Sequence, residues 1–247
     1  MVSRISENKE EMYALMQKLN DMNIKLDGVP GFYKKGNSYR ISLPGLYDKN
    51  TKTFFYGSGF FVPSFGRNGK IFSMQIRMDD TYLSRFPAKQ AKRRRYIWFT
   101  SSGYDSGCQA INRATYGVVD GTPRNTGNVV YVTEGALKAQ VAHDIDHKHR
   151  QFCAISGIAN SEAFRKFVRT QKKAGCKILV DAFDMDRNEK DTVKNAIDKL
   201  YAIAEEEGLP LQPFAWDERF KGIDDYLLHC RDERIQQQII MEICKTA

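Results

Sequence analysis

Three segments within residues 128–186 decide the fold: NVVYVTEGALKAQVAHDI (128–145), QFCAISGIANSEAFRKFV (151–168) and CKILVDAFDMD (176–186). Each segment opens with a short run of β-branched or apolar residues that ends in Gly or Asp. The first two runs are followed by apolar residues at helical spacing. Strands that alternate with helices are typical of βαβ units, so the sequence predicts an α/β fold with a parallel sheet flanked by helices.

Acidic side chains stand at the ends of two of the predicted strands. Glu134 ends the first strand, and Asp184 and Asp186 end the third at positions i and i+2, on one side of an extended strand end. Ligands of open α/β sheets bind outside the carboxyl ends of the strands, so we expect the three carboxylates to converge there. Converging carboxylates repel one another unless a cation neutralises them, and oxygen ligands suit Mg²⁺ or Mn²⁺.

The order TEG, SG and DMD at the ends of three successive strands resembles the Toprim domain. This domain is shared by bacterial DnaG-type primases, type IA and type II topoisomerases and some nucleases. The resemblance covers about residues 128–230 and implies that Glu134, Asp184 and Asp186 are catalytic and bind Mg²⁺ or Mn²⁺.

The net charge of +8 is unevenly distributed over the 247 residues. Residues 1–128 hold 20 Lys and Arg against 10 Asp and Glu, whereas the remainder holds 18 against 20. A basic module beside an acidic, metal-binding module suits an enzyme that holds a polyanion by its phosphates. We place the boundary in the segment GTPRNTGN, which gives a basic α+β subdomain at residues 1–127 and a Toprim-like domain with C-terminal helices at residues 128–247.

The N-terminal sequence MVSRISENKEEM is too polar for a signal peptide, and no apolar run is long enough to span a membrane. We therefore expect a cytoplasmic protein that does not bind membranes. The five cysteines are widely spaced and lack a CxxC pair, which disfavours a zinc ribbon or a disulfide framework. Cys153 and Cys176 fall inside predicted strands and are expected to be core residues.

A hairpin is predicted in residues 57–80, with its turn at residues 67–69. Together with the aromatic segment that follows, this hairpin resembles the N-terminal subdomain of the DnaG-type primase core. The elements that carry the resemblance are Phe61-Val62-Pro63, Asn68-Gly69-Lys70, Gln75-Ile76-Arg77, Arg95-Tyr96-Ile97-Trp98 and Ser101-Ser102. The chain is similar to primase-like proteins of plasmids, phages and integrative elements, which implies a role in DNA replication with nucleotides and a replicative helicase as partners.

The strongest positive cluster of the chain lies between the hairpin and the aromatic segment. Its phosphate contacts would position single-stranded DNA or RNA without reading its sequence, although a run of charges can also be a solvated surface. The candidate nucleic-acid-binding residues are Arg77, Lys89, Lys92, Arg93, Arg94, Arg95, Tyr96, Trp98 and Lys138.

Two departures from the primase pattern affect the predicted site. Lys138 stands where primases carry an aspartate on the first helix, so one acid is lost and one cation is gained. In KGIDDYLLHC (221–230), which resembles the acidic motif that follows the last Toprim strand, Asp224 and Asp225 are adjacent rather than alternate. We expect Asp224 to be the one that faces the site and assists metal binding.

The resemblance implies a primase-like, divalent-metal-dependent nucleotidyltransferase that acts on single-stranded nucleic acid, and two other functions stay open. A Toprim nuclease would use the same acids with water as the nucleophile. A catalytically silent nucleic-acid-binding or inhibitor protein could retain the scaffold, and the cation at Lys138 favours it. His143, His147 and His149 offer a rival zinc site, but without an HExxH glutamate we expect an exposed helix end.

Overall fold

The computed structural model describes residues 4–5, 8–48, 52–120, 122–123, 128–146, 148–185 and 191–246. The chain divides into two compact units, each of which is discontinuous in sequence. Unit 1 comprises Met1–Ser64 and Ile71–Ile111, and unit 2 comprises Phe65–Lys70 and Asn112–Ala247. The chain therefore passes from one unit to the other three times, after residues 64, 70 and 111.

The division lies earlier in the chain than the boundary expected at residue 127. Residues from 112 onward belong to unit 2, because Thr115 and Tyr116 pair in antiparallel fashion with a strand of its sheet. This strand pairing was not predicted, because only two residues take part in it and the surrounding sequence has the composition of a loop.

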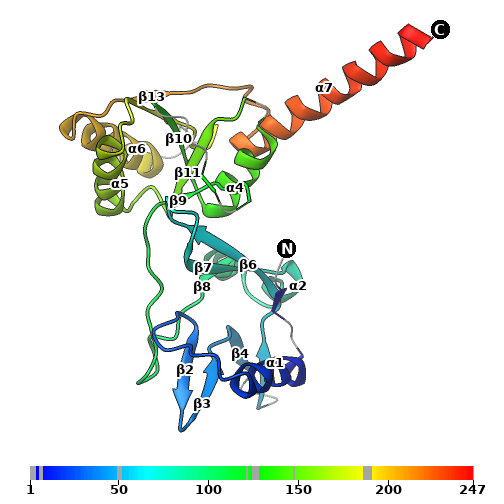
Figure 1. Cartoon of the computed structure of the whole chain (residues 1–247), viewed down its shortest axis with the longest axis vertical. Coiled ribbons are helices and arrows are strands. Elements are labelled where there is room, and N and C mark those ends of the chain that lie inside the picture. The colour runs from blue at the N-terminus through cyan, green and yellow to red at the C-terminus, as the bar shows by residue number, and fades with distance from the viewer. Residues whose placement is uncertain are drawn as a thin grey trace. The chain divides into compact units, whose positions relative to one another are not determined.

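Unit 2 is built on a five-stranded sheet with the order β13-β12-β10-β11-β9 (Figure 1). Neighbouring strands from β13 to β11 run parallel, and β9 is antiparallel to β11. The fold is therefore α/β with a mostly parallel sheet, as the sequence predicted. The strands are β9 (Thr115–Tyr116), β10 (Val129–Glu134), β11 (Gln151–Ile155), β12 (Ile178–Asp181) and β13 (Leu211–Pro213).

The strand order contains one reversal, which lies between β10 and β12. The chain moves from β10 to β11 on one side, and then returns across β10 to place β12 on its other side. Since parallel crossovers are right-handed, such a reversal sends the connecting helices to opposite faces of the sheet. A reversal of this kind creates a crevice at the carboxyl ends of the two strands, where ligands of α/β proteins bind.

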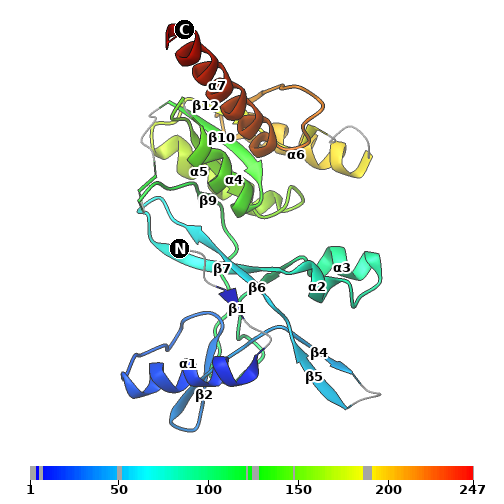
Figure 2. The same cartoon turned by 90° about the vertical axis from the view of Figure 1, so that its right-hand side faces the viewer.

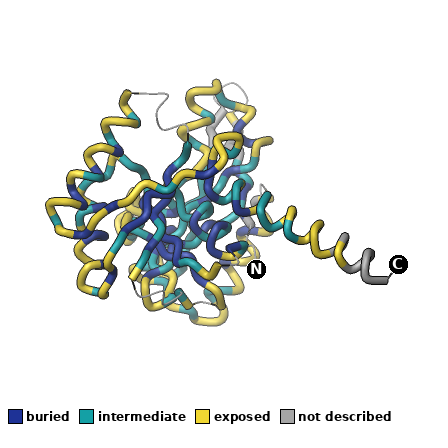
Figure 3. The backbone as a smooth tube through the Cα atoms, turned by 90° about the horizontal axis from the view of Figure 1, so that it is seen from above, coloured by how far each residue is buried: buried dark blue, intermediate teal, exposed yellow. Residues whose placement is uncertain are grey.

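Helices cover both faces of this sheet (Figure 1). On one face, α4 (Ala136–Ile145) and α7 (Ile223–Thr246) pack with Phe152 and Ala154 of β11. On the other face, α5 (Ser161–Lys173) and α6 (Asp191–Glu206) pack with Cys153 and Ile155 of the same strand. Successive residues of a strand point to opposite faces, so β11 is buried at every position. Figure 3 colours the backbone by the burial of each residue.

The third parallel strand is shorter than predicted, and the expectation that Asp184 ends it is wrong. Strand β12 stops at Asp181, whose buried carboxylate accepts hydrogen bonds from the Phe183 backbone N–H at 2.9 Å and the Tyr201 hydroxyl at 2.8 Å. These bonds turn the chain after Asp181. Asp184 therefore lies on the loop that follows the strand, and Asp186 lies outside the described residues.

Unit 1 contains a four-stranded sheet with the order β1-β6-β7-β8 and two separate hairpins (Figure 2). The predicted hairpin is present, with β6 and β7 joined by a turn in which Gly69 has a φ of 72°. The helices and strands of unit 1 are β1 (Arg4–Ile5), α1 (Lys9–Asp21), β2 (Phe32–Lys35), β3 (Ser38–Ile41), β4 (Gly45–Asp48), β5 (Thr53–Tyr56), β6 (Gly59–Phe65), β7 (Ile71–Met78), α2 (Asp80–Leu83), α3 (Ala88–Arg94) and β8 (Tyr96–Trp98).

The core of unit 1 forms where the sheet meets α2 and the segment after β8. Ile76, Met78, Tyr82 and Phe99 are almost fully buried there. Phe99 packs edge-on against Phe61, with ring centroids 5.0 Å apart. This aromatic contact fixes the start of the long connection that follows β8.

Cys153 and Cys176 are buried core residues, as the sequence predicted, and they are free thiols, as are Cys108 and Cys230. No described helix is both long enough and apolar enough to cross a membrane.

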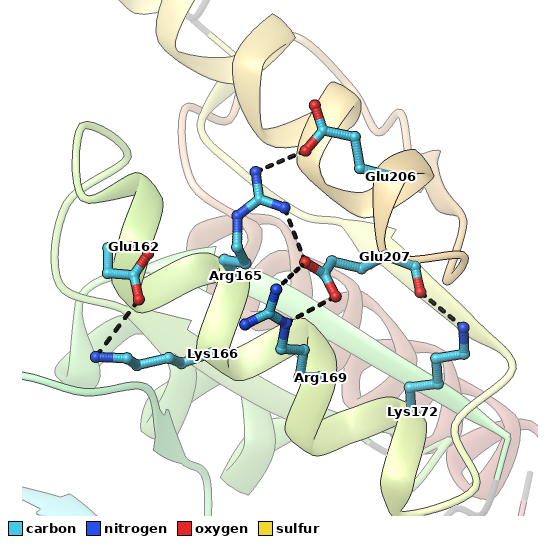
Figure 4. A network of polar contacts seen from close by, with 7 residues as sticks. All are labelled: Glu162, Arg165, Lys166, Arg169, Lys172, Glu206 and Glu207. Carbon is cyan, nitrogen blue, oxygen red and sulfur yellow. Dashed lines mark hydrogen bonds and ion pairs between the residues drawn. The ribbon is translucent and has the colours of Figure 1, made fainter.

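Arginines of α5 hold the end of α6 through a network of charged contacts (Figure 4). Arg165 contacts Glu206 at 2.6 Å and Glu207 at 2.8 Å. Arg169 binds both carboxylate oxygens of Glu207 at 2.8 Å. The Lys172 ammonium group donates to the Glu207 backbone carbonyl oxygen at 2.7 Å, so α6 ends against α5. The bidentate hydrogen bonds from Arg169 and the single hydrogen bond from Arg165 lower the pKa of Glu207 to about 2 from an ordinary value of 4.5.

We expect Glu207→Gln to lower the Tm of the protein in a pH-dependent way. The folded-state pKa is depressed, so the stabilising contribution is present above pH 4.5 and is lost as the pH falls towards about 2. The difference in Tm between the wild type and the variant should therefore be largest at neutral pH and should shrink through this window. Glu162→Gln is the matched control, because Glu162 forms an exposed pair with Lys166 at 3.5 Å and should change the Tm little at any pH.

Candidate functional site

Glu134 and Asp184 stand on either side of the reversal in strand order. Glu134 is the last residue of β10, and its Cα is opposite that of Ile155. The Ala182 backbone N–H donates to the Val132 carbonyl at 2.8 Å, which keeps the segment after β12 beside β10. Both carboxylates are therefore carried to the carboxyl edge of the sheet, where a crevice is expected from the topology.

Gly135 makes the turn from β10 into α4 possible. Its φ of +90° is a conformation that side-chain-bearing residues rarely adopt. Its backbone N–H donates to the Ile155 carbonyl at 3.1 Å, so the turn is tied to the neighbouring strand. The turn after that strand also borders the acid, because a Cβ added to Gly157 would lie 4.0 Å from Glu134 Oε1. The turns at Gly135 and Gly157, which belong to the EG and SG pairs of the sequence, thus both lie beside the Glu134 carboxylate.

Asp184 is held by two lysines. The Lys138 ammonium group, from the first turn of α4, forms an ion pair with Asp184 Oδ1. Lys221 Nζ lies 3.9 Å from Asp184 Oδ2, and the Lys221 carbonyl accepts a hydrogen bond from the Met185 backbone N–H at 2.9 Å. Lys221 was not predicted as a site residue, although it lies in the motif KGIDDYLLHC. Its position near Asp184 follows from a backbone contact between segments that are distant in sequence.

Asp224 points inward at the start of α7, whereas the neighbouring Asp225 is exposed. The Asp224 Oδ1 atom is buried and makes no hydrogen bond within the described part of the chain. Burial raises the pKa of Asp224; the charge of Lys138 opposes this shift, and that of Asp225 adds to it. The absence of a side chain at Gly222 makes room for the Asp224 carboxylate and the Lys138 ammonium group. A Cβ added to Gly222 would lie 2.3 Å from Asp224 Oδ1 and 3.2 Å from Lys138 Nζ.

The donor chemistry of this edge fits a hard divalent cation. Glu134, Asp184 and Asp224 offer carboxylate oxygens, and Asp224 Oδ1 is a buried acceptor with no described donor. Among the described residues, no group of three His, Cys, Asp or Glu side chains is gathered closely enough to hold a metal ion. Lys138 already neutralises Asp184, so a cation at this carboxylate would have to displace the ammonium group.

The histidines do not form the rival zinc site within the described residues. His143 is fully buried on α4, whereas His149 is exposed and has a φ of 53°. His147 lies outside the described residues.

Most of the basic cluster lies on the exposed surface of α3 in unit 1. Lys89, Lys92, Arg93 and Arg95 are exposed and form no ion pair with any residue that the structure describes. Arg94 differs, because its guanidinium group lies 4.6 Å from the centroid of the Phe86 ring and packs against it. Four of the five cations are thus available to phosphates, and one is a packing residue.

The remaining candidate contacts belong to β7 and β8. Arg77 pairs with Asp80 at 3.3 Å and lies 5.8 Å from the centroid of the Tyr96 ring. Tyr96 is 40% exposed, and Trp98 is half-buried opposite Gln75. The predicted nucleic-acid-binding residues therefore gather in unit 1, except for Lys138, which lies among the acids of unit 2.

Residues 124–233, fewer than half of the chain, match the family described as "Domain of unknown function (DUF3854)". No curated protein matches the chain in sequence. Among solved structures, the chain is similar to the primase fragment of the bacteriophage T7 primase-helicase protein, with 15% identity and a TM-score of 0.43. This similarity covers 74% of the chain and 63% of that fragment.

A chain in the structure of the bacteriophage T7 lagging-strand DNA polymerase with primase domains of two gp4 subunits, bound to an RNA/DNA hybrid and dTTP, is similar at 14% identity. The TM-score is 0.41, and the similarity covers 75% of this chain and 80% of that one. Similarities at this level assign no activity to the protein.

We expect Asp224→Asn to raise the Tm at pH 7. A buried carboxylate oxygen without a hydrogen bond, such as Asp224 Oδ1, costs on the order of 1 kcal/mol, which corresponds to about 2–4 °C for a chain of this size. Because the folded-state pKa is raised, the destabilisation exists only where Asp224 is ionised, so the gain should disappear below pH 3.8. Asp225→Asn, at an exposed position, should leave the Tm unchanged; an equal rise in both variants would contradict this account.

We expect the α3 cations to differ in their effect on binding to single-stranded nucleic acid. Replacing Lys92, Arg93 and Arg95 together by Ala should reduce the slope of log K against log salt by about 2, because each phosphate contact contributes about 0.7. Arg94→Ala should leave the slope almost unchanged and lower the Tm, since this side chain packs on Phe86. The weakening should be similar for unrelated sequences. An unchanged slope in the triple variant would assign the cluster to a solvated surface.

Proposed function

We propose that this protein is a primase-like nucleotidyltransferase that acts on single-stranded nucleic acid with a divalent metal ion, Mg²⁺ or Mn²⁺, as its cofactor. The observation that carries the proposal is the placement of acidic residues at the ends of the two strands that flank the reversal in strand order of unit 2. Glu134 ends β10 and Asp184 follows β12, and Asp224 supplies a buried oxygen without a described donor. The Toprim-like order of the sequence motifs supports the same assignment.

Glu134, Asp184 and Asp224 would hold the metal ion through their carboxylate oxygens. Bound there, the cation would supply Lewis-acid chemistry that neutralises phosphate oxygens during transfer of a nucleotidyl group to a 3′-hydroxyl, with release of pyrophosphate. Lys138 orients the Asp184 carboxylate through its ion pair. Released from Asp184, the same ammonium group can bind a phosphate oxygen of the nucleotide.

A second candidate function is favoured by a specific contact. The ion pair of Lys138 with Asp184 supplies within the chain the positive charge that a metal would bring. If that pair persists in the presence of metal and nucleotide, the site is silent and the protein only binds nucleic acid through the cations of α3. The two functions therefore differ in what Lys138 does.

An assay with a single-stranded template, labelled nucleotides and Mg²⁺ or Mn²⁺ separates these functions. We expect new short products from the wild type, and their loss in Asp184→Asn because a metal ligand is removed. Asp225→Asn is the control with a similar change of charge at an exposed position and should retain activity. A shortened template in the same lane would instead identify a nuclease, and binding without either product would identify the silent protein.

Lys138→Met then distinguishes a phosphate-binding lysine from a blocking one. If Lys138 binds nucleotide phosphate, the variant should lose activity and bind nucleotide more weakly, while its affinity for Mn²⁺ rises. If Lys138 blocks the site, the variant should gain Mn²⁺ affinity together with activity. Lys221→Met is the matched control, since Lys221 lies near the same carboxylate at the longer distance of 3.9 Å.

A further inference from the structure

A cavity of about 930 Å³ lies within unit 1, remote in sequence from the acidic residues. Four tyrosines, Tyr13, Tyr33, Tyr56 and Tyr104, share its lining with Lys35 and Arg40. The volume is at the upper end of the range of about 300–1,000 Å³ that is typical of small-molecule sites. Its walls come from α1, the β2–β3 hairpin, β5 and the connection after β8.

Hydrogen bonds fix these walls to one another. The Asn20 side chain at the end of α1 accepts from the Tyr39 backbone N–H at 2.9 Å and donates to the Tyr39 carbonyl at 3.3 Å. Ser106 Oγ accepts from the Lys34 backbone N–H at 2.6 Å. Ser101 Oγ donates to the Phe32 carbonyl at 2.6 Å. The helix and the connection are thus both anchored to the hairpin, so the cavity is preformed.

The tyrosines present aromatic surface to this cavity. Tyr33 and Tyr104 are stacked in parallel, with ring centroids 3.6 Å apart and an interplanar angle of 3°. Tyr104 is 45% exposed and Tyr13 is 47% exposed, although both line the cavity. A planar ligand can therefore extend the existing stack on Tyr104, as nucleobases do on the aromatic platforms of single-strand-binding proteins.

The charge of the cavity lining is positive. Lys35 and Arg40 form no ion pair with any described residue, and no described residue of the lining is acidic. The preceding lysine behaves differently, because Lys34 pairs with Asp27 at 2.8 Å and covers the Tyr39 ring at 5.0 Å from its centroid. Two cations thus remain available at the cavity, while the one on the opposite side of the strand is neutralised.

We propose that the cavity of unit 1 binds nucleotides of single-stranded nucleic acid, with a base stacked on Tyr104 and the backbone phosphates bound by Lys35 and Arg40. Stacked aromatic rings beside unneutralised cations suit a ligand that joins a planar ring to an anion, and a nucleotide has this composition. The site is distinct from the α3 cations and from the acids of unit 2, and it does not depend on catalysis.

Photochemical cross-linking of the full-length protein to an oligothymidylate that carries 5-iodouracil tests the location directly. We expect peptides that contain Tyr104 or Tyr33 to be cross-linked. Cross-links confined to other peptides would overturn the proposal.

Binding measurements with a fluorescent twelve-nucleotide oligothymidylate test the chemistry. Tyr104→Ala should weaken binding between about 5-fold and 150-fold, which corresponds to the loss of one stacked base, without a change in the salt slope. Tyr104→Phe should bind as the wild type does, which separates stacking from loss of fold. Lys35→Ala with Arg40→Ala should reduce the slope of log K against log salt by about 1.4.

Lys34→Ala is the matched control, since this neighbouring lysine is neutralised by Asp27, and it should leave the salt slope almost unchanged. Competition by ATP or TTP alone distinguishes a free nucleotide from a strand as the ligand. If ATP or TTP displaces the oligothymidylate from the wild type but not from Tyr104→Ala, the cavity binds free nucleotides. If neither nucleotide displaces the oligothymidylate from the wild type, the cavity binds the strand. Unchanged affinity and slope in both the tyrosine and the double cation variants would refute nucleotide binding at this cavity.

Discussion

Parallel pairing on both edges of β10 is the constraint on which unit 2 depends. Val132 is opposite Cys153 on one edge and Asp181 on the other, so this strand fixes the register of both neighbours. A slip of one residue would exchange the two faces of the strand, and the alternating core residues would no longer fit. The same register carries Glu134 to the reversal in strand order, beside the segment that bears Asp184. Packing of the core and placement of the acids are therefore set by one set of backbone hydrogen bonds.

The carboxylates at the carboxyl edge of the unit 2 sheet are partly neutralised by a lysine of the same unit. Like charges in a partly buried site repel one another, and each loses hydration. Lys138 relieves this for Asp184 by a direct ion pair and for Asp224 by its nearby charge. The Lys138 ammonium group therefore lowers the apparent affinity of Asp184 for any metal ion, because the ion must bind more strongly than the ammonium group that it replaces.

The regular elements of unit 2 could be predicted because their periodicity is local. Helix α4 spans Ala136–Ile145, as the spacing of apolar residues predicted, and the parallel sheet follows from the alternation of strands and helices. The end of β12 could not be predicted, since it depends on hydrogen bonds from Phe183 and Tyr201 to one buried carboxylate. The ion pair between Lys138 and Asp184 could not be predicted either, because the two residues are distant in sequence and only the fold brings them together. The placement of Asp186 stays a prediction.

The three passages of the chain between its units limit how the protein can be divided. Residues 65–70 form the tip of the hairpin whose strands lie mostly in unit 1, yet they belong to unit 2. There the Phe65 backbone N–H donates to Thr115 Oγ1 at 2.7 Å. A gene fragment that begins at residue 112 would encode unit 2 without this segment and would leave Thr115 without its donor. Recombination at that point would therefore exchange neither unit intact.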